Sequence, residues 1–400
     1  MRHWIGSLAV VALTLLPPVA AHAQDRAVDK VQAALDRWLA ARAPVEKVTG
    51  VAAYVSFGTP GPTIEAFAGK VGRNAGDAPV GQDTLFQMGS TTKSFAAAIL
   101  LQLESEGRLT LDDTLGRWLP EYPAWKDVSL RRLLNMTSGL PNYSETEAMS
   151  RAWIETPQRI LSAAELVALA YPAPSNALPP NSGYFYSNTN YILAGMVAAK
   201  AAGKPYRDQV HERLLQPLGL HSMFYEDRVY PPAVTARLAH GWFENPGCAE
   251  YQPKCTVSWN QRLVGRDVRE LSLGWGQAAG GGIANARDLS RWQRAVFEGR
   301  VVPPKQQAEW LALVSTRTGQ PIADVSADNP GGFALGLARG KRGDQPAQWF
   351  YEGMTLGYRS LYVWFEAEKL MITVQTNSQP ADGEGKLADA VSAIHEAVRR

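Results

Sequence analysis

Metal ligands and excess charge are both scarce in this sequence. It contains 2 cysteines and 6 histidines in 400 residues, and no pair of them has ligand spacing with a second pair nearby, so we expect no metal site. The 40 lysines and arginines nearly balance the 38 aspartates and glutamates, which leaves a formal charge of +2. This balance gives no electrostatic reason to expect a nucleic acid, and we expect a small-molecule partner.

Apolar runs long enough to cross a bilayer are also missing. The early run over residues 5–16 follows a basic start and precedes Ala21-His22-Ala23, a small-x-small cleavage site. These features are typical of an export signal, and the run is too short for a membrane span. We therefore expect residues 1–23 to be a signal peptide cleaved near Ala23, and the mature protein to be periplasmic or secreted, without stable membrane insertion.

The two cysteines, Cys248 and Cys255, lie in a stretch rich in proline, tryptophan and charge. An oxidising compartment permits them to form a disulfide across a short loop. The alternative is two free thiols in a polar surface loop.

Strand patterns concentrate near both ends of the chain. The predicted strands are residues 48–57, 63–70, 333–338, 347–352, 357–365 and 370–376. Helical spacing marks residues 25–41, 287–297 and 386–398, and a helix that begins near residue 90.

This arrangement predicts an α/β (α+β) fold with an antiparallel sheet built from both chain ends and flanked by helices. We assign residues 24–108 and 270–400 to the sheet domain. Residues 109–269, where prolines interrupt short helical pieces, are predicted to form an inserted, mostly helical lobe with an irregular excursion. The cleft is expected between the two parts.

Ser90 and Lys93 lie one helical turn apart at the start of an apolar helical run that closes at Gly107. A serine hydroxyl needs a base to attack at neutral pH. Lys93 shares a helix face with Ser90, and burial near the positive end of the helix favours its neutral amine. Lowering a lysine pKa to about 7 costs about 4–5 kcal/mol, so the cleft must be dry or positively charged. The spacing alone also fits a solvated surface lysine.

A second motif, Tyr186-Ser187-Asn188, lies in an aromatic run after a proline-rich turn. A tyrosine or its phenolate can take the proton of Ser90 and return it to a leaving group. Asn188 can hold a substrate amide or carbonyl. The alternative is an aromatic-rich loop with Asx turns.

With these motifs the chain resembles the serine β-lactamase and penicillin-binding-protein superfamily, in particular the branch of class C β-lactamases, D-alanyl-D-alanine carboxypeptidases, D-aminopeptidases and class VIII carboxylesterases. The sequences of residues 86–89, 133–141 and 279–283 share in the resemblance. It implies a two-lobed β-lactamase/transpeptidase-like fold, an acyl-enzyme on Ser90, and no metal or organic cofactor.

The third motif of this family is lysine-threonine-glycine, or histidine-x-glycine, on a strand facing the nucleophile. The matching segment here is Tyr351-Glu352-Gly353. Strand alternation sends Tyr351 toward the cleft as a substrate-binding residue and Glu352 away from it. A phenol cannot pair with a substrate carboxylate as a cation does. Penicillins and a terminal D-alanine are therefore disfavoured relative to esters and uncharged amides, unless Arg359 supplies the cation.

The resemblance also implies an oxyanion hole made by the backbone amides of Ser90 and Met354. Gly353 would let the substrate chain approach the strand. A structural alternative for this residue is a bulge glycine.

We therefore predict an exported serine hydrolase with esterase or D-amino-acid peptidase or amidase activity, favoured over β-lactam hydrolysis. Two alternatives stay open: a β-lactamase or D,D-carboxypeptidase proper, and an inactive protein that binds peptide or wall fragments, for which Tyr351 is the sequence support. An α/β-hydrolase is set aside because no Gly-x-Ser-x-Gly elbow occurs. The oligomeric state stays open.

Overall fold

The computed structural model describes residues 18–172, 183–246 and 261–399. Its centre is an antiparallel sheet with strand order β2-β1-β13-β12-β11-β10-β9-β7-β8. These strands are β1 (Gly50–Phe57), β2 (Thr63–Gly69), β7 (Leu313–Ser315), β8 (Pro321–Ile322), β9 (Gly331–Phe333), β10 (Ala338–Gly340), β11 (Gln348–Met354), β12 (Arg359–Phe365) and β13 (Leu370–Thr376).

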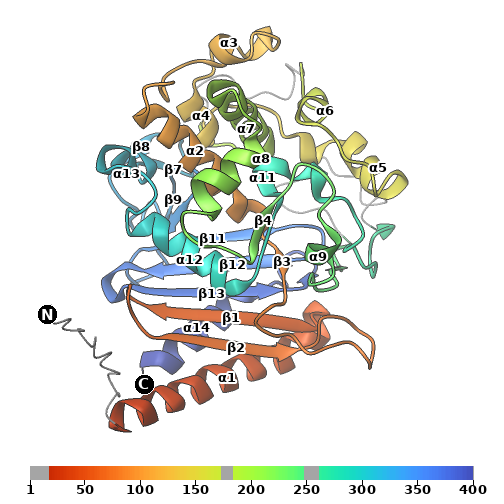
Figure 1. The fold of residues 1–400 in the computed structure, drawn as a ribbon, viewed down its shortest axis with the longest axis vertical. Helices are drawn as coiled ribbons and strands as arrows, with labels where there is room; N and C mark the ends of the chain where they lie inside the picture. The colour runs from red at the N-terminus through yellow and green to blue at the C-terminus, as the bar shows by residue number, and fades with distance from the viewer. Residues whose placement is uncertain (1–17, 173–182, 247–260, 400) are drawn as a thin grey trace, which may run out of the picture.

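Both ends of the chain contribute to this sheet, as the sequence predicts. β1 lies between β2 and β13, and Val51 stands opposite Thr376. Figure 1 shows β2, β1, β13, β12 and β11 following one another from α1 toward the helical part of the molecule. The predicted fold class is confirmed.

Helices lie before, between and after these strands. They are α1 (Pro18–Glu46), α2 (Lys93–Ser105), α3 (Leu115–Trp118), α4 (Leu130–Leu134), α5 (Glu147–Glu155), α6 (Ala163–Ala168), α7 (Asn188–Ala202), α8 (Tyr206–Gln209), α9 (Pro232–Thr235), α11 (Gln277–Gly280), α12 (Ala286–Phe297), α13 (Pro304–Trp310) and α14 (Leu387–Arg399).

The first and last helices, α1 and α14, pack together on one face of the sheet. Their apolar residues, such as Val31 and Ile394, are buried against Val51, Ile372 and Val374 of the strands. Apolar residues at helical spacing meet strand residues that point to this face, so burial of both holds the layer together.

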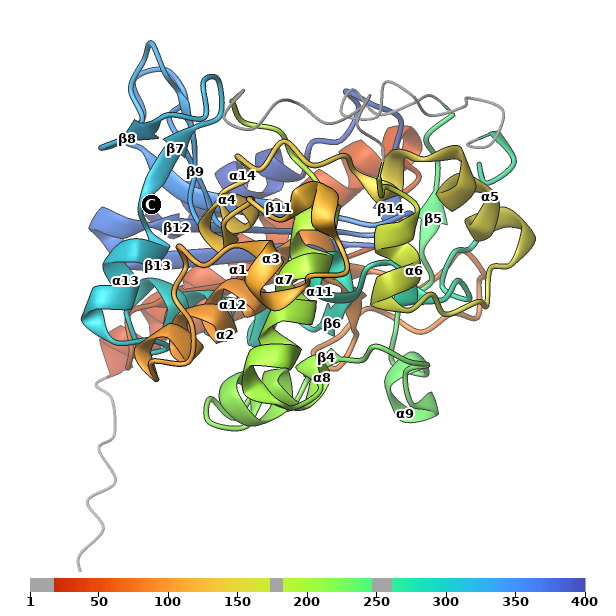
Figure 2. The ribbon, with the colours of Figure 1, turned by 90° about the horizontal axis from the view of Figure 1, so that it is seen from above.

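The opposite face is covered by α12 and by the helical lobe. Within this part, α7 lies against α2 and α11 (Figure 2). Phe95 of α2 meets Trp292 of α12 edge to face, with ring centroids 5.1 Å apart. The residues of α2 from Lys93 to Leu101 are all buried, so a lysine stands at the start of an enclosed and mostly apolar helical segment.

One strand prediction is wrong. Residues 333–338 are not a single strand, because a turn in which Ala334 N–H donates to the Leu337 carbonyl (2.8 Å) separates β9 from β10. Gly336 has a φ of +76° in this turn, and a Cβ there would lie 2.9 Å from the Tyr191 hydroxyl. The apolar pattern of the segment resembles a strand, but tertiary packing bends it.

Short strands beside the nucleophile were not predicted. A small sheet of order β3-β6-β4 is made by β3 (Phe86–Gln87), β4 (Met223–Tyr225) and β6 (Gly282–Ala284). A parallel pair is formed by β5 (Trp242–Phe243) and β14 (Ser378–Gln379).

The domain boundaries set from the sequence stay a prediction. Cys248 and Cys255 lie outside the described residues, and so does their proposed disulfide. Within the described ranges, no helix combines the length and apolar character needed to cross a membrane.

Candidate active site

Ser90 lies in a 3-10 turn, Gly89–Thr92, that leads directly into α2. Its neighbour Gly89 has a φ of +52°, and a Cβ there would lie 2.6 Å from the backbone nitrogen of Met354. Only glycine permits both this backbone conformation and this approach. The turn therefore holds Ser90 against the end of β11.

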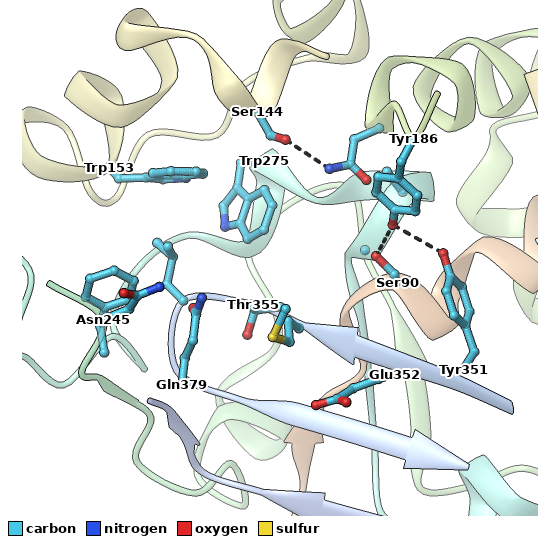
Figure 3. A pocket seen from close by; sticks show the side chains of 16 residues that line it. Ser90, Ser144, Trp153, Tyr186, Asn245, Trp275, Tyr351, Glu352, Thr355 and Gln379 are labelled. Carbon is cyan, nitrogen blue, oxygen red and sulfur yellow. Dashed lines mark hydrogen bonds between the residues drawn. The ribbon is translucent and has the colours of Figure 1, made fainter. Parts of the chain in front are cut away.

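The hydroxyl of Ser90 meets both predicted proton-transfer groups. Its Oγ lies 2.5 Å from the Tyr186 hydroxyl and 2.9 Å from Lys93 Nζ. Figure 3 shows the Tyr186 hydroxyl pointing at Ser90. The structure thus brings together three side chains that are up to 96 positions apart in the sequence.

Lys93 is fully buried, and its amine contacts three oxygens. Besides Ser90 Oγ, these are Asn188 Oδ1 at 2.7 Å and the Ala279 carbonyl at 2.6 Å. Burial lowers the pKa of Lys93, while the nearby Tyr186 opposes this shift. The oxygens of Asn188 and Ala279 can only accept, so a neutral amine gives them two hydrogens and turns its lone pair to Ser90.

The orientation of Asn188 is set by a chain of hydrogen bonds. Its Nδ2 donates to Ser144 Oγ (2.9 Å), and Ser144 in turn donates to Asn142 Oδ1 (3.0 Å). The amide oxygen of Asn188 must therefore face Lys93. The sequence predicts a substrate contact for Asn188, whereas both ends of its amide here contact protein groups.

Sequence reasoning missed Ser144 and Asn142. Asn142 caps the 3-10 turn Tyr143–Glu145 and also accepts from the Asn188 backbone amide at 3.1 Å. An available signal was their position directly after the motif at residues 133–141.

Tyr351 faces the cleft, as strand alternation predicts. Its hydroxyl donates to the Tyr186 hydroxyl at 3.2 Å. Glu352 lies on the other side of β11 (Figure 3), and burial raises the pKa of its carboxyl, while Arg359 opposes this shift.

The suggestion that Arg359 could replace the family cation is wrong. Arg359 is 1% exposed, and its guanidinium donates to the Glu46 carboxylate and to the Ser378 carbonyl. Glu46 ends α1, so Arg359 points to the face of the sheet that α1 and α14 cover. It cannot reach a substrate at Ser90.

The backbone amides of Ser90 and Met354 belong to two segments in close contact, since a Cβ at Gly353 would lie 2.9 Å from Ser90 N. The Ser90 amide is in the first turn of its helix, where no helical acceptor exists. Directly after β11, Thr355 N–H donates to the Tyr358 carbonyl (3.0 Å), and bonded and non-bonded pairs alternate in an antiparallel ladder. The Met354 amide therefore points away from β12, toward Gly89 and Ser90. An oxyanion hole made by these two amides stays a prediction.

A cavity of about 310 Å³ opens beside Ser90. Trp153 and Trp275 form one wall, with ring centroids 5.3 Å apart in an edge-to-face arrangement. Among the described residues, no arginine, lysine or histidine lines this cavity. Tyr143 is buried and donates to the Trp275 carbonyl, which places it behind the wall.

Fold and site together define a protein with a serine, a lysine and a tyrosine in contact at one cleft. The family model named Beta-lactamase matches residues 37–396. The chain therefore belongs to that family, as its motifs predict.

Among curated proteins, the chain is similar to Penicillin-binding protein 4* of Bacillus subtilis (strain 168), with 32% identity over 250 residues, 61% of this chain and 52% of that protein. It is also similar to Esterase EstB of Burkholderia gladioli, with 35% identity over 163 residues, 38% of this chain and 41% of that protein. The chain spans about half the length of the curated relatives it matches.

Solved structures match over nearly the whole chain. The D-stereospecific amidohydrolase from Streptomyces sp. has 26% identity and a TM-score of 0.70, covering 90% of this chain and 98% of that one. The D-amino acid amidase from Ochrobactrum anthropi SV3, complexed with D-phenylalanine, has 25% identity and a TM-score of 0.75, covering 93% and 99%.

Proposed function

We propose that this protein hydrolyses small esters or amides through a covalent acyl-enzyme on Ser90, and that esterase or D-amino-acid amidase or peptidase activity exceeds β-lactam hydrolysis. The observation that supports it most directly is the contact of Ser90 Oγ with Lys93 Nζ at 2.9 Å and with the Tyr186 hydroxyl at 2.5 Å. A binding module needs no such activated hydroxyl.

The proposed reaction follows from these contacts. Ser90 Oγ bonds to the substrate carbonyl carbon as its proton passes to the Lys93–Tyr186 pair. The amides of Ser90 and Met354 bind the resulting oxyanion. When the tetrahedral intermediate collapses, the leaving group departs with that proton. Water then attacks the acyl-enzyme by the same route and restores the Ser90 hydroxyl.

The lining of the cavity supports substrates without a free carboxylate. Arg359 is engaged on the far face of the sheet, and Tyr351 supplies a neutral hydroxyl where the family has a cation. The indole rings of Trp153 and Trp275 suit an apolar acyl or leaving group. The names of the esterase and amidase relatives agree with this substrate class.

A labelling experiment tests the nucleophile. A fluorophosphonate probe should attach to Ser90, as located by mass spectrometry of the digested protein. Ser90→Ala and heat-denatured wild-type protein are the controls and should stay unlabelled. Absence of label on folded wild-type protein would contradict the proposal and favour the alternative of an inactive binding protein.

A substrate comparison tests the class. We expect faster turnover of a short-chain aryl ester or a D-amino acid amide than of a chromogenic cephalosporin. Much faster turnover of the cephalosporin would reverse this order and indicate a β-lactamase proper.

We also propose that residues 1–23 direct export to the periplasm or beyond. Cleavage after Ala23 would shorten α1 at its start and leave the buried Val31 and Leu35 in place. N-terminal sequencing of the exported protein should give Gln24 as the first residue. An unprocessed protein that stays in the cytoplasm would contradict this.

A further inference from the structure

The hydroxyl of Tyr351 points at another tyrosine of the site. It donates to Tyr186 at 3.2 Å, and Tyr186 lies 2.5 Å from Ser90 Oγ. Figure 3 shows these three hydroxyls in sequence, from β11 to the nucleophile. A group whose hydrogen is already engaged in this way is poorly placed to bind substrate.

The ring of Tyr351 is buried and packs against another aromatic ring. It is 8% exposed and meets Phe333 edge to face, with centroids 5.7 Å apart. Phe333 is held from another side by Tyr184 at 5.6 Å. Burial raises the pKa of Tyr351 well above its usual range, so its hydroxyl keeps its hydrogen throughout the pH range in which the enzyme would work.

We propose that Tyr351 is a positioning residue that acts on Ser90 through Tyr186. Its hydrogen bond fixes the Tyr186 oxygen beside the nucleophile and stabilises that oxygen more strongly as phenolate than as phenol, since hydrogen bonds to charged acceptors are stronger. Tyr186 can then accept the Ser90 proton as Oγ bonds to the substrate, and later release it to the leaving group. This inference rests on the proposed function.

The residue at position 351 also decides whether the cavity carries a positive charge. A cation at this place could stabilise the Tyr186 phenolate and also attract a substrate carboxylate. A buried phenol keeps the hydrogen bond to Tyr186 and brings no charge into the cavity. A tyrosine at position 351, in place of the family's cation, can therefore help to activate the nucleophile without also attracting a substrate carboxylate.

The test compares Tyr351→Phe with wild type in ester hydrolysis and in fluorophosphonate labelling, both as a function of pH. Without the donated hydrogen bond, the deprotonated form of the site that accepts the Ser90 proton is less stable, so the acidic limb of kcat/KM should move to higher pH. We expect kcat/KM to fall about tenfold, the effect of one hydrogen bond to a charged group, mainly through kcat.

Tyr362→Phe is the matched control. Tyr362 stands directly opposite Tyr351 on β12, and its buried hydroxyl has no hydrogen-bond partner among the described residues. Removing it should leave the rate and the pH profile unchanged. If Tyr351→Phe behaves like Tyr362→Phe, the positioning role is wrong.

Tyr351→His provides the second variant, because it keeps an N–H donor at this position. It should recover most of the rate lost in Tyr351→Phe, and equal losses in both folded variants would overturn the proposal. If Tyr351→Phe does not fold, a folded Tyr351→His protein below about a hundredth of the wild-type kcat/KM contradicts it. Wild-type protein that does not label at Ser90 refutes the proposed function, whereas normal wild-type labelling with an unshifted Tyr351→Phe profile refutes this inference alone.

Discussion

Two buried basic side chains, Lys93 and Arg359, lie on opposite sides of the central sheet, and their partners differ. Lys93 contacts neutral oxygens, and no carboxylate is among its partners in the described residues. Arg359 contacts the Glu46 carboxylate, which is itself 0% exposed. Burial lowers the pKa of Lys93, and the opposing effect of Tyr186 is smaller than this loss of water.

The Glu46–Arg359 pair joins separate parts of the fold. Arg359 belongs to β12 and Glu46 ends α1, and the Glu46 carboxylate also accepts from Arg42 (2.7 Å) and from the Lys386 amide (3.0 Å). A buried basic side chain paired with a carboxylate is thus a structural link, while a buried lysine amine among neutral oxygens can serve as a base. Four predictions test this contrast.

The largest effect is expected for Lys93→Met, which replaces the amine by an apolar chain of similar length. Loss of a general base should lower kcat/KM by about 10²–10⁴-fold. The free energy of unfolding should stay equal or increase, because the buried amine is destabilising. Ester kinetics and urea unfolding measure the two quantities. A large loss of stability would show that Lys93 is structural, like Arg359.

For Arg359→Met we expect the opposite pattern, a loss of stability with little change in activity. Removing one partner of a buried ion pair leaves the Glu46 carboxylate without its buried cation and should cost about 3 kcal/mol, with Arg42 limiting the damage. The kcat/KM per folded molecule should change little. The double variant Glu46→Gln with Arg359→Met should regain part of the stability. A selective loss of activity in stable Arg359→Met protein would contradict the assignment.

The pH dependence of stability gives a third test. Between the lowered pKa of folded Lys93 and its unfolded value of about 10.4, the unfolded chain binds more protons, so Lys93 makes stability rise with pH in this window. The slope contributed by this one group is at most about 1.4 kcal/mol per pH unit. Urea unfolding of wild type and Lys93→Met at several alkaline pH values isolates it. Parallel curves for the two proteins would mean that Lys93 is not held neutral.

The fold could be predicted where local pattern and structure agree. Residues 370–376 are flanked on both sides by turn residues, and they form β13 with the predicted bounds. Residues 333–338 failed because their turn depends on α13: the Leu335 amide donates to the Trp310 carbonyl (3.3 Å), and the Trp310 indole donates to the Leu335 carbonyl (2.9 Å). Such long-range contacts leave no periodic signal in the sequence.

In the site, too, features with a local sequence motif could be predicted, and features set by long-range contacts could not. Ser90, Lys93 and Tyr186 could be found because the chemistry requires these residue types in short motifs. The side of the sheet to which Arg359 points depends on the pairing of β11 with β12, and the role of Ser144 depends on where its loop meets α7. Neither can be derived from spacing along the chain.

The smallest effect is expected for Ser144→Ala, which touches Lys93 only through Asn188. Removing the Ser144 hydroxyl leaves Asn188 Nδ2 without its acceptor, so the amide is no longer forced to turn its oxygen to Lys93. We expect kcat/KM to fall about tenfold, with a stability loss of about 1 kcal/mol.

Ser138→Ala is the matched control for this variant. Ser138 is also buried, at 2% exposed, and donates to Asn190 on the same helix at 2.7 Å, but this pair does not touch Lys93. Its loss should cost similar stability and leave kcat/KM unchanged. Equal losses of activity in the two variants would mean that Ser144 supports only the packing of the lobe. The orientation of the Asn188 amide would then not matter for the function of Lys93.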